Sequence, residues 1–113
     1  MAINAWRWGC WTVWAVVCTP ALAQTVAPAL AGAQVLALKS LAATCANCHG
    51  TDGRAAEGSS VTSLAGMDRT YLLKQMTDFK SGARPATVMH QISKGYSDAQ
   101  IDALAGYFAE LPK

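Results

Sequence analysis

The feature that most constrains this chain is a run of five residues, Cys45-Ala46-Asn47-Cys48-His49. Two thiols separated by two residues, with a histidine directly after the second thiol, form the pattern by which haem is attached covalently to a polypeptide. One helical turn can present both sulfur atoms to the two vinyl groups on one edge of the porphyrin. The imidazole of His49 then lies under the ring, where one nitrogen can bind iron and the other can donate a hydrogen bond. The motif therefore predicts one covalently bound haem c, attached at Cys45 and Cys48, with His49 as an iron ligand.

A Cys-x-x-Cys pair has three other uses in proteins. A thioredoxin-like redox centre needs a strand–helix–strand context, which the surrounding sequence does not offer. A tetrahedral zinc site would have to join both cysteines to His49 and to His90, the only other histidine, in an improbable arrangement. A plain short-loop disulfide is the third alternative. The adjacent histidine, an N-terminal export signal and a downstream methionine together favour haem attachment.

Residues 1–23 have the features of a secretory signal peptide. Arg7 is the only charged side chain, residues 8–17 are largely apolar, and an Ala-Leu-Ala sequence ends at position 23. We expect cleavage there and no stable membrane insertion afterwards. Retention of the leader as a membrane anchor and lipidation at Cys18 are alternatives, although the apolar stretch is short for a membrane span.

The remaining residues are expected to form one small domain. Residues 24–32 are rich in small side chains, include Pro28, and are predicted to be a flexible N-terminal segment, which leaves a single-haem domain over 33–113. The whole chain has nine Lys and Arg against seven Asp and Glu, and one arginine lies in the leader, so the domain is nearly neutral. Without a basic stripe or an aromatic platform, a nucleic-acid partner has no support. A protein core of this size is marginal, and a buried porphyrin would supply apolar surface for helices to pack against.

Three segments are predicted to be helical, and together they predict an all-α fold. They are residues 33–44, residues 68–81 with Asp68 as N-cap and Gly82 beyond the end, and a final helix opened by a capping box at Ser97 and ending at Pro112. Residues 86–95 are expected to be a loop or short turn. Apolar side chains recur at helical spacing in each segment, namely Val35, Leu38, Leu41 and Ala42; Leu72, Met76 and Phe79; and Ile101, Leu104, Ala105, Phe108 and Leu111.

The second axial ligand has four candidates, Met67, Met76, Met89 and His90. Met76 shares a face with apolar residues, where methionine usually fills a core. Met67 lies at the start of a helix, nearer the side of His49. Met89 follows a Gly-Pro break and precedes the last helix, so it can reach the opposite face of the haem, and methionine–histidine ligation is an arrangement used for electron transfer. We therefore predict Met89, with His90 as a competitor.

The order of these elements over residues 41–111 resembles that of class I cytochromes c. Ser63-Leu64-Ala65-Gly66 and the stretches 78–84, 87–89 and 94–98 resemble, within that family, the small cytochrome subunit of flavocytochrome c sulfide dehydrogenase. They also resemble one half of the two-haem periplasmic cytochromes. The resemblance implies a small fold of about three main helices wrapped around one covalently attached haem, with His49 and Met89 as iron ligands.

In that family the cytochrome is periplasmic and accepts electrons from a flavoprotein subunit that oxidises sulfide. A proline often precedes Ser-Leu-Ala-Gly there, and its carbonyl holds the axial histidine; this sequence has Thr62 at that place, and His90 replaces what is often a small or acidic residue. A backbone carbonyl near this segment is accordingly expected to accept the N–H of His49.

The function predicted is that of an exported electron carrier, which is not an enzyme by itself. A free-standing carrier between membrane complexes is one alternative to a flavoprotein-bound subunit. A haem protein with an open iron site, binding a gas or performing catalysis, is an alternative of another class. Lys74, Lys80, Arg84 and Lys94 could neutralise haem propionates or form a docking surface, and scattered surface charges explain them equally well.

Overall fold

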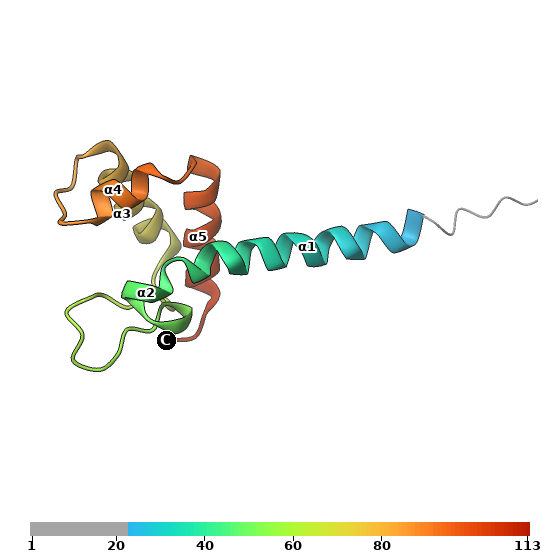
Figure 1. Ribbon diagram of the computed structural model, residues 1–113, viewed down its shortest axis with the longest axis horizontal. Helices are drawn as coiled ribbons and strands as arrows, with labels where there is room; N and C mark the ends of the chain where they lie inside the picture. The colour runs from blue at the N-terminus through green and yellow to red at the C-terminus, as the bar shows by residue number, and fades with distance from the viewer. Residues whose placement is uncertain (1–22) are drawn as a thin grey trace, which may run out of the picture.

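The computed structural model describes residues 23–113, which are helical and contain no strand. Figure 1 shows the elements in chain order: α1 (Ala23–Ala43), α2 (Ala46–His49), the 3-10 helix η1 (Thr51–Gly53), α3 (Arg69–Ser81), α4 (Met89–Lys94) and α5 (Asp98–Glu110). The all-α prediction is confirmed, and the three long helices α1, α3 and α5 correspond to the three predicted segments. Apart from Ala23, the predicted leader lies outside the described residues. Across this part of the chain, no helix is both long enough and apolar enough to cross a membrane.

Helix α1 is longer than predicted. Residues 24–32, expected to be a flexible segment, form its first turns. The stretch is rich in alanine, which has the highest helix propensity. Pro28 lies inside the helix near its N-terminus, where it removes one intrahelical hydrogen bond. In Figure 1 this part of α1 extends away from the other helices.

Helix α3 begins and ends as the sequence predicts. The side chain of Asp68 accepts a hydrogen bond from the backbone N–H of Tyr71 at 2.8 Å, which makes it the N-cap. Gly82 ends the helix in the left-handed conformation, with φ of 84°.

The prediction of a loop over residues 86–95 is wrong in part, because residues 89–94 form α4. In the first turn of this helix, the carbonyl oxygen of Val88 accepts hydrogen bonds from the backbone N–H groups of Gln91 and Ile92, at 2.9 and 3.1 Å. A six-residue helix is too short to show apolar periodicity. Its N-cap residue Val88 forms no side-chain cap, so the usual start signal is also missing.

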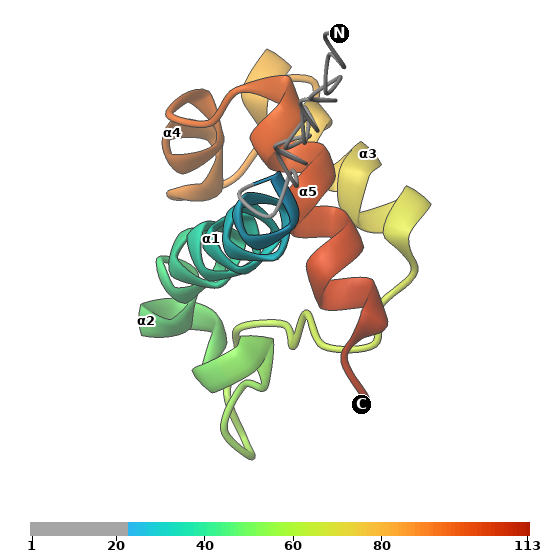
Figure 2. The same ribbon diagram turned by 90° about the vertical axis from the view of Figure 1, so that its right-hand side faces the viewer.

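The core lies where the C-terminal end of α1, the first turns of α3 and one face of α5 meet, and Figure 2 shows how these three helices are arranged. Helix α5 begins at the predicted capping box, in which Ser97 and Gln100 bond each other's backbone N–H groups. Val35, predicted to lie on the apolar face of α1, is 55% exposed because only the end of that helix reaches the core. The buried cluster consists of Ala42, Leu72, Leu104, Ala105 and Phe108.

Candidate functional site

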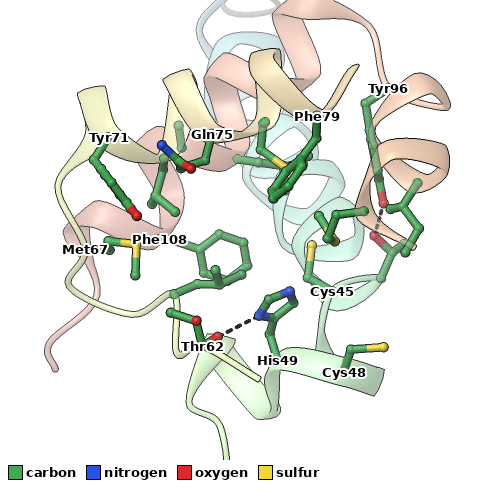
Figure 3. A pocket seen from close by; sticks show the side chains of 18 of the residues that line it. Cys45, Cys48, His49, Thr62, Met67, Tyr71, Gln75, Phe79, Tyr96 and Phe108 are labelled. Carbon is green, nitrogen blue, oxygen red and sulfur yellow. Dashed lines mark hydrogen bonds between the residues drawn. The ribbon is translucent and has the colours of Figure 1, made fainter. Parts of the chain in front are cut away.

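His49 is held in one orientation by a single hydrogen bond. It is the last residue of α2, and its Nδ1 lies 2.7 Å from the backbone carbonyl oxygen of Thr62, thirteen residues later (Figure 3). A carbonyl oxygen can only accept, so Nδ1 carries the proton and donates it. The acceptor expected near residues 62–66 is therefore present. With Nδ1 engaged, Nε2 is the nitrogen left to bind a metal ion.

Cys45 is the N-cap residue of α2 and Cys48 lies within this helix, and the two cysteines differ in exposure. Cys45 is half-buried and Cys48 is exposed, and both are free thiols. Burial raises the pKa of the Cys45 thiol above its ordinary value; a hydrogen bond with Thr44 opposes the rise, and the nearby Cys48 adds to it. Both cysteines and His49 therefore come from a single turn of helix.

Two of the alternative uses of this cysteine pair receive no support from the geometry. Within residues 23–113 there is no strand, so the context of a thioredoxin-like centre is missing. The same part of the chain contains no group of three or more His, Cys, Asp or Glu side chains arranged to hold a metal ion. A zinc site that includes His90 is therefore not formed.

A pocket of about 240 Å³ opens above His49. One water molecule needs roughly 15 Å³, so the pocket has room for a much larger group. It is walled by α2, the segment around Thr62, and helices α3, α4 and α5, and its lining is mainly apolar. Most of the side chains that line it are apolar or aromatic: Leu64, Met67, Tyr71, Leu72, Met76, Phe79, Met89, Ile92, Tyr96, Leu104, Ala105 and Phe108.

The residues present fit a haem. Both thiols of the motif and the His49 imidazole line the pocket, so the groups for covalent attachment and for iron ligation share one cavity with an apolar surface. Figure 3 shows the His49 and Cys45 side chains on one side of this cavity and Phe79 on the other.

All three candidate methionines line the pocket, and their environments differ. The sulfur of Met76 accepts a hydrogen bond from the buried Ser93 hydroxyl at 3.6 Å, which assigns it a packing role. Met67 packs against the core cluster. Met89, half-buried at the first position of α4, remains the candidate whose sulfur has neither of these roles.

His90 is placed differently from its neighbour. Of the two residues, only Met89 belongs to the pocket lining, because successive residues of a helix point about 100° apart. The Nδ1 atom of His90 is buried and has no hydrogen-bond partner within the described residues. The structure thus brings His49 and Met89 to one cavity and leaves His90 outside it.

Several pocket residues were not identified from the sequence. Tyr71 and Gln75 line the pocket from α3 together with Phe79. Their spacing of four residues is the signal that could have revealed them, because it places all three on one helix face. Thr44 and Tyr96 belong to the lining too, and no local pattern marks either one.

The basic residues that could neutralise haem propionates differ in their surroundings. Only Arg84 lines the pocket, with its guanidinium 4.8 Å from the centroid of the Phe79 ring. Lys74 pairs with Asp78 on the surface of α3. Lys80 donates to the backbone carbonyl of Tyr96 at 2.8 Å and to the Asp98 carboxylate at 2.7 Å.

Comparison with known proteins gives consistent results. Residues 29–112 match the family model described as cytochrome c. The cytochrome subunit of sulfide dehydrogenase from Chlorobaculum tepidum is 41% identical over 73 residues, which are 65% of this chain and 64% of that protein. The thiosulfate dehydrogenase electron acceptor of Stutzerimonas stutzeri is 39% identical over 71 residues, 63% of this chain and 33% of that protein.

A solved structure of cytochrome c4 from Acidithiobacillus ferrooxidans is similar in fold. It superposes with a TM-score of 0.56 at 39% sequence identity, over 59% of this chain and 38% of that chain. The chain spans less than two thirds of the length of each of these three proteins.

Proposed function

The chain belongs to the cytochrome c family, with haem c as its covalently bound cofactor, and from this premise we propose that it is a single-haem electron carrier. Cys45 and Cys48 would hold the haem through thioether bonds, and His49 and Met89 would bind its iron. When bound, the haem supplies a one-electron couple between ferric and ferrous iron. Because His49 and Met89 would leave no place for a substrate on the iron, the protein acts as a carrier and not as an enzyme.

The observation that carries this proposal is the hydrogen bond from His49 Nδ1 to the Thr62 carbonyl at 2.7 Å. It fixes both the tautomer and the ring orientation of the imidazole, as second-shell acceptors do for metal-bound histidines. Nε2 is then the nitrogen available to the pocket, which Met89 also lines. This arrangement requires the same imidazole geometry in both iron oxidation states, which suits rapid electron transfer.

The surroundings of the pocket favour a raised reduction potential. A thioether ligand raises the potential relative to a second imidazole, and apolar burial disfavours the extra positive charge of ferric iron. The apolar side chains on α3 and α5 supply that burial, and Leu72, Leu104 and Phe108 among them are buried.

We propose further that the donor is the flavoprotein subunit of a sulfide-oxidising dehydrogenase and that the protein works in the periplasm. Support comes from the name of the Chlorobaculum relative and from the predicted leader over residues 1–23. A relative that accepts electrons from thiosulfate dehydrogenase supports a redox partner in sulfur oxidation more generally. Co-purification of a flavin-containing subunit separates a dehydrogenase subunit from a free-standing carrier.

The test of iron ligation is the absorption spectrum of the haem-loaded protein, oxidised and reduced, compared with Met89→Leu. Leucine keeps the volume of methionine and removes the sulfur. We expect a low-spin ferric spectrum with the weak sulfur-to-iron band at its red end in the wild type, and loss of that band in Met89→Leu.

Met76→Leu is the matched control, because it makes the same substitution at another methionine that lines the pocket. We expect this variant to keep the band. A low-spin spectrum unchanged by Met89→Leu would reject Met89 and favour another ligand, with His90 the first to test. A high-spin wild-type spectrum that shifts with carbon monoxide would reject the electron-carrier function and favour a haem protein with an open iron site.

A further inference from the structure

One hydrogen bond joins the two chain segments that the proposed function places on opposite faces of the haem. The hydroxyl of Tyr96 lies 2.7 Å from Thr44 Oγ1, 52 residues earlier in the sequence (Figure 3). Thr44 directly precedes Cys45, and Tyr96 follows the end of α4 by two residues. Both side chains line the pocket.

The direction of this bond follows from a second contact. Thr44 Oγ1 also lies 2.7 Å from the carbonyl oxygen of Leu41. A hydroxyl has one proton and a carbonyl only accepts, so Thr44 donates to Leu41 and accepts from Tyr96. The Tyr96 hydroxyl is therefore the donor, and its removal deletes the bond without leaving an unpaired donor on Thr44.

Helix α4, which begins with Met89, is attached to the rest of the domain mainly through its packing against α3, where Ser93 is fully buried. Val88 and Ile92 are 54% and 41% exposed, and the helix has no side-chain N-cap. Ser93 bonds Met76 and Lys80 bonds the Tyr96 carbonyl, and both of these contacts lead to α3. Among the hydrogen bonds of the described residues, the Tyr96–Thr44 bond is the one that links the α4 region to the haem-attaching segment.

We propose that Tyr96 is a positioning residue that holds α4 closed over the pocket and so limits the replacement of the Met89 sulfur by an external ligand. This inference rests on the proposed function, because it requires Met89 to bind the iron. Lifting Met89 away from the iron moves the start of α4, and the bond at its other end opposes this movement by tying α4 to Thr44. Without the bond, the open arrangement is populated more often.

The test uses imidazole as the external ligand and the haem-loaded ferric protein, and compares the wild type with Tyr96→Phe. Phenylalanine keeps the ring and removes only the hydroxyl. A single hydrogen bond changes such an equilibrium by roughly three- to tenfold, so imidazole is expected to bind Tyr96→Phe tighter by that factor and to enter correspondingly faster. Loss of the sulfur-to-iron band reports binding.

Tyr107→Phe is the control, since it removes a tyrosine hydroxyl from α5 at a residue outside the pocket lining. We expect it to bind imidazole as the wild type does. Thr44→Val added to Tyr96→Phe is expected to change imidazole binding far less than Thr44→Val alone, because the two residues share one bond.

Two results would overturn the inference while leaving Met89 ligation intact. One is imidazole binding to Tyr96→Phe that matches the wild type. The other is an equal gain in Tyr107→Phe, which would indicate a general loss of stability. If instead Met89→Leu keeps the sulfur-to-iron band, the ligand assignment itself fails, so the two failures are distinguishable.

Discussion

Gly50, the residue that follows His49, has a backbone conformation that a residue with a side chain rarely adopts. Its φ and ψ of 81° and 165° lie in a region that is essentially restricted to glycine. A Cβ atom there would lie 1.9 Å from the carbonyl oxygen of Arg54. The chain forms a tight turn at this point, in which the backbone N–H of Gly53 donates to the carbonyl oxygen of Gly50 at 2.9 Å. The turn that follows His49 therefore requires a glycine at position 50.

We predict that Gly50→Ala destabilises the haem-loaded protein far more than Gly58→Ala. Both glycines have positive φ, and a Cβ at Gly58 meets nothing within 4 Å. The Gly58 variant should lose about 1 kcal/mol of unfolding free energy for the left-handed backbone alone. The Gly50 variant should lose about 3 kcal/mol or more, because the backbone must also move away from Arg54.

Denaturant unfolding followed by haem absorbance measures the difference between these two variants. Equal unfolding free energies would mean that the turn after His49 relaxes without cost, and the geometry described for Gly50 would then be incorrect.

Among the elements, α5 has the most complete local start signal. Ser97 accepts from the backbone of Gln100 at 3.2 Å, and the Gln100 side chain accepts from the Ser97 N–H at 2.8 Å. Four side chains of this helix are buried, so fraying of its first turn would disturb the core. The cap therefore contributes to the stability of the domain as well as to that of the helix.

We predict that Ser97→Ala lowers the unfolding free energy by about 1 kcal/mol, and that Ser97→Thr recovers most of the loss. The reason is that threonine keeps the oxygen that accepts from Gln100. Thermal unfolding of the haem-loaded protein measures the change in unfolding free energy. Ser60→Ala, at an exposed loop position, is the control. An alanine variant as stable as the Ser60 control would show that the box does not contribute.

In the molecule as a whole, only the C-terminal end of α1 packs against the other helices. All described side chains from 28 to 37 are exposed, including Leu30 and Leu36 at 58% and 66%. Ala42, near the C-terminal end, is buried against α3 and α5. The haem-binding domain is therefore independent of the N-terminal turns of this helix.

We predict that deleting residues 24–32 changes the unfolding free energy by less than about 0.5 kcal/mol and leaves the absorption spectrum unaltered. Among them, residues 28–32 have exposed side chains and are not part of the core cluster. By contrast, Ala42→Leu should destabilise the protein by about 1–3 kcal/mol, because it overpacks the contact with α3 and α5. A deletion as harmful as Ala42→Leu would require a packing role for the early turns of α1.

The sequence by itself determined the haem motif at 45–49, the caps at Asp68 and Ser97, and the apolar face of α5. Each of these depends on residues no more than about four positions apart, so propensity, capping and helical spacing suffice to define them. Family resemblance and loop position also pointed to Met89 and to the carbonyl at Thr62, the second of which the structure confirms.

Only the tertiary structure decided how far α1 extends, that residues 89–94 form a helix, and that Met89 and not His90 lines the pocket. It alone joined Tyr96 to Thr44, across 52 residues. These features arise where segments distant in sequence pack together, and the energy of such contacts depends on which face each helix turns toward its neighbours. Local sequence patterns do not determine these contacts, because they form only when the chain has folded.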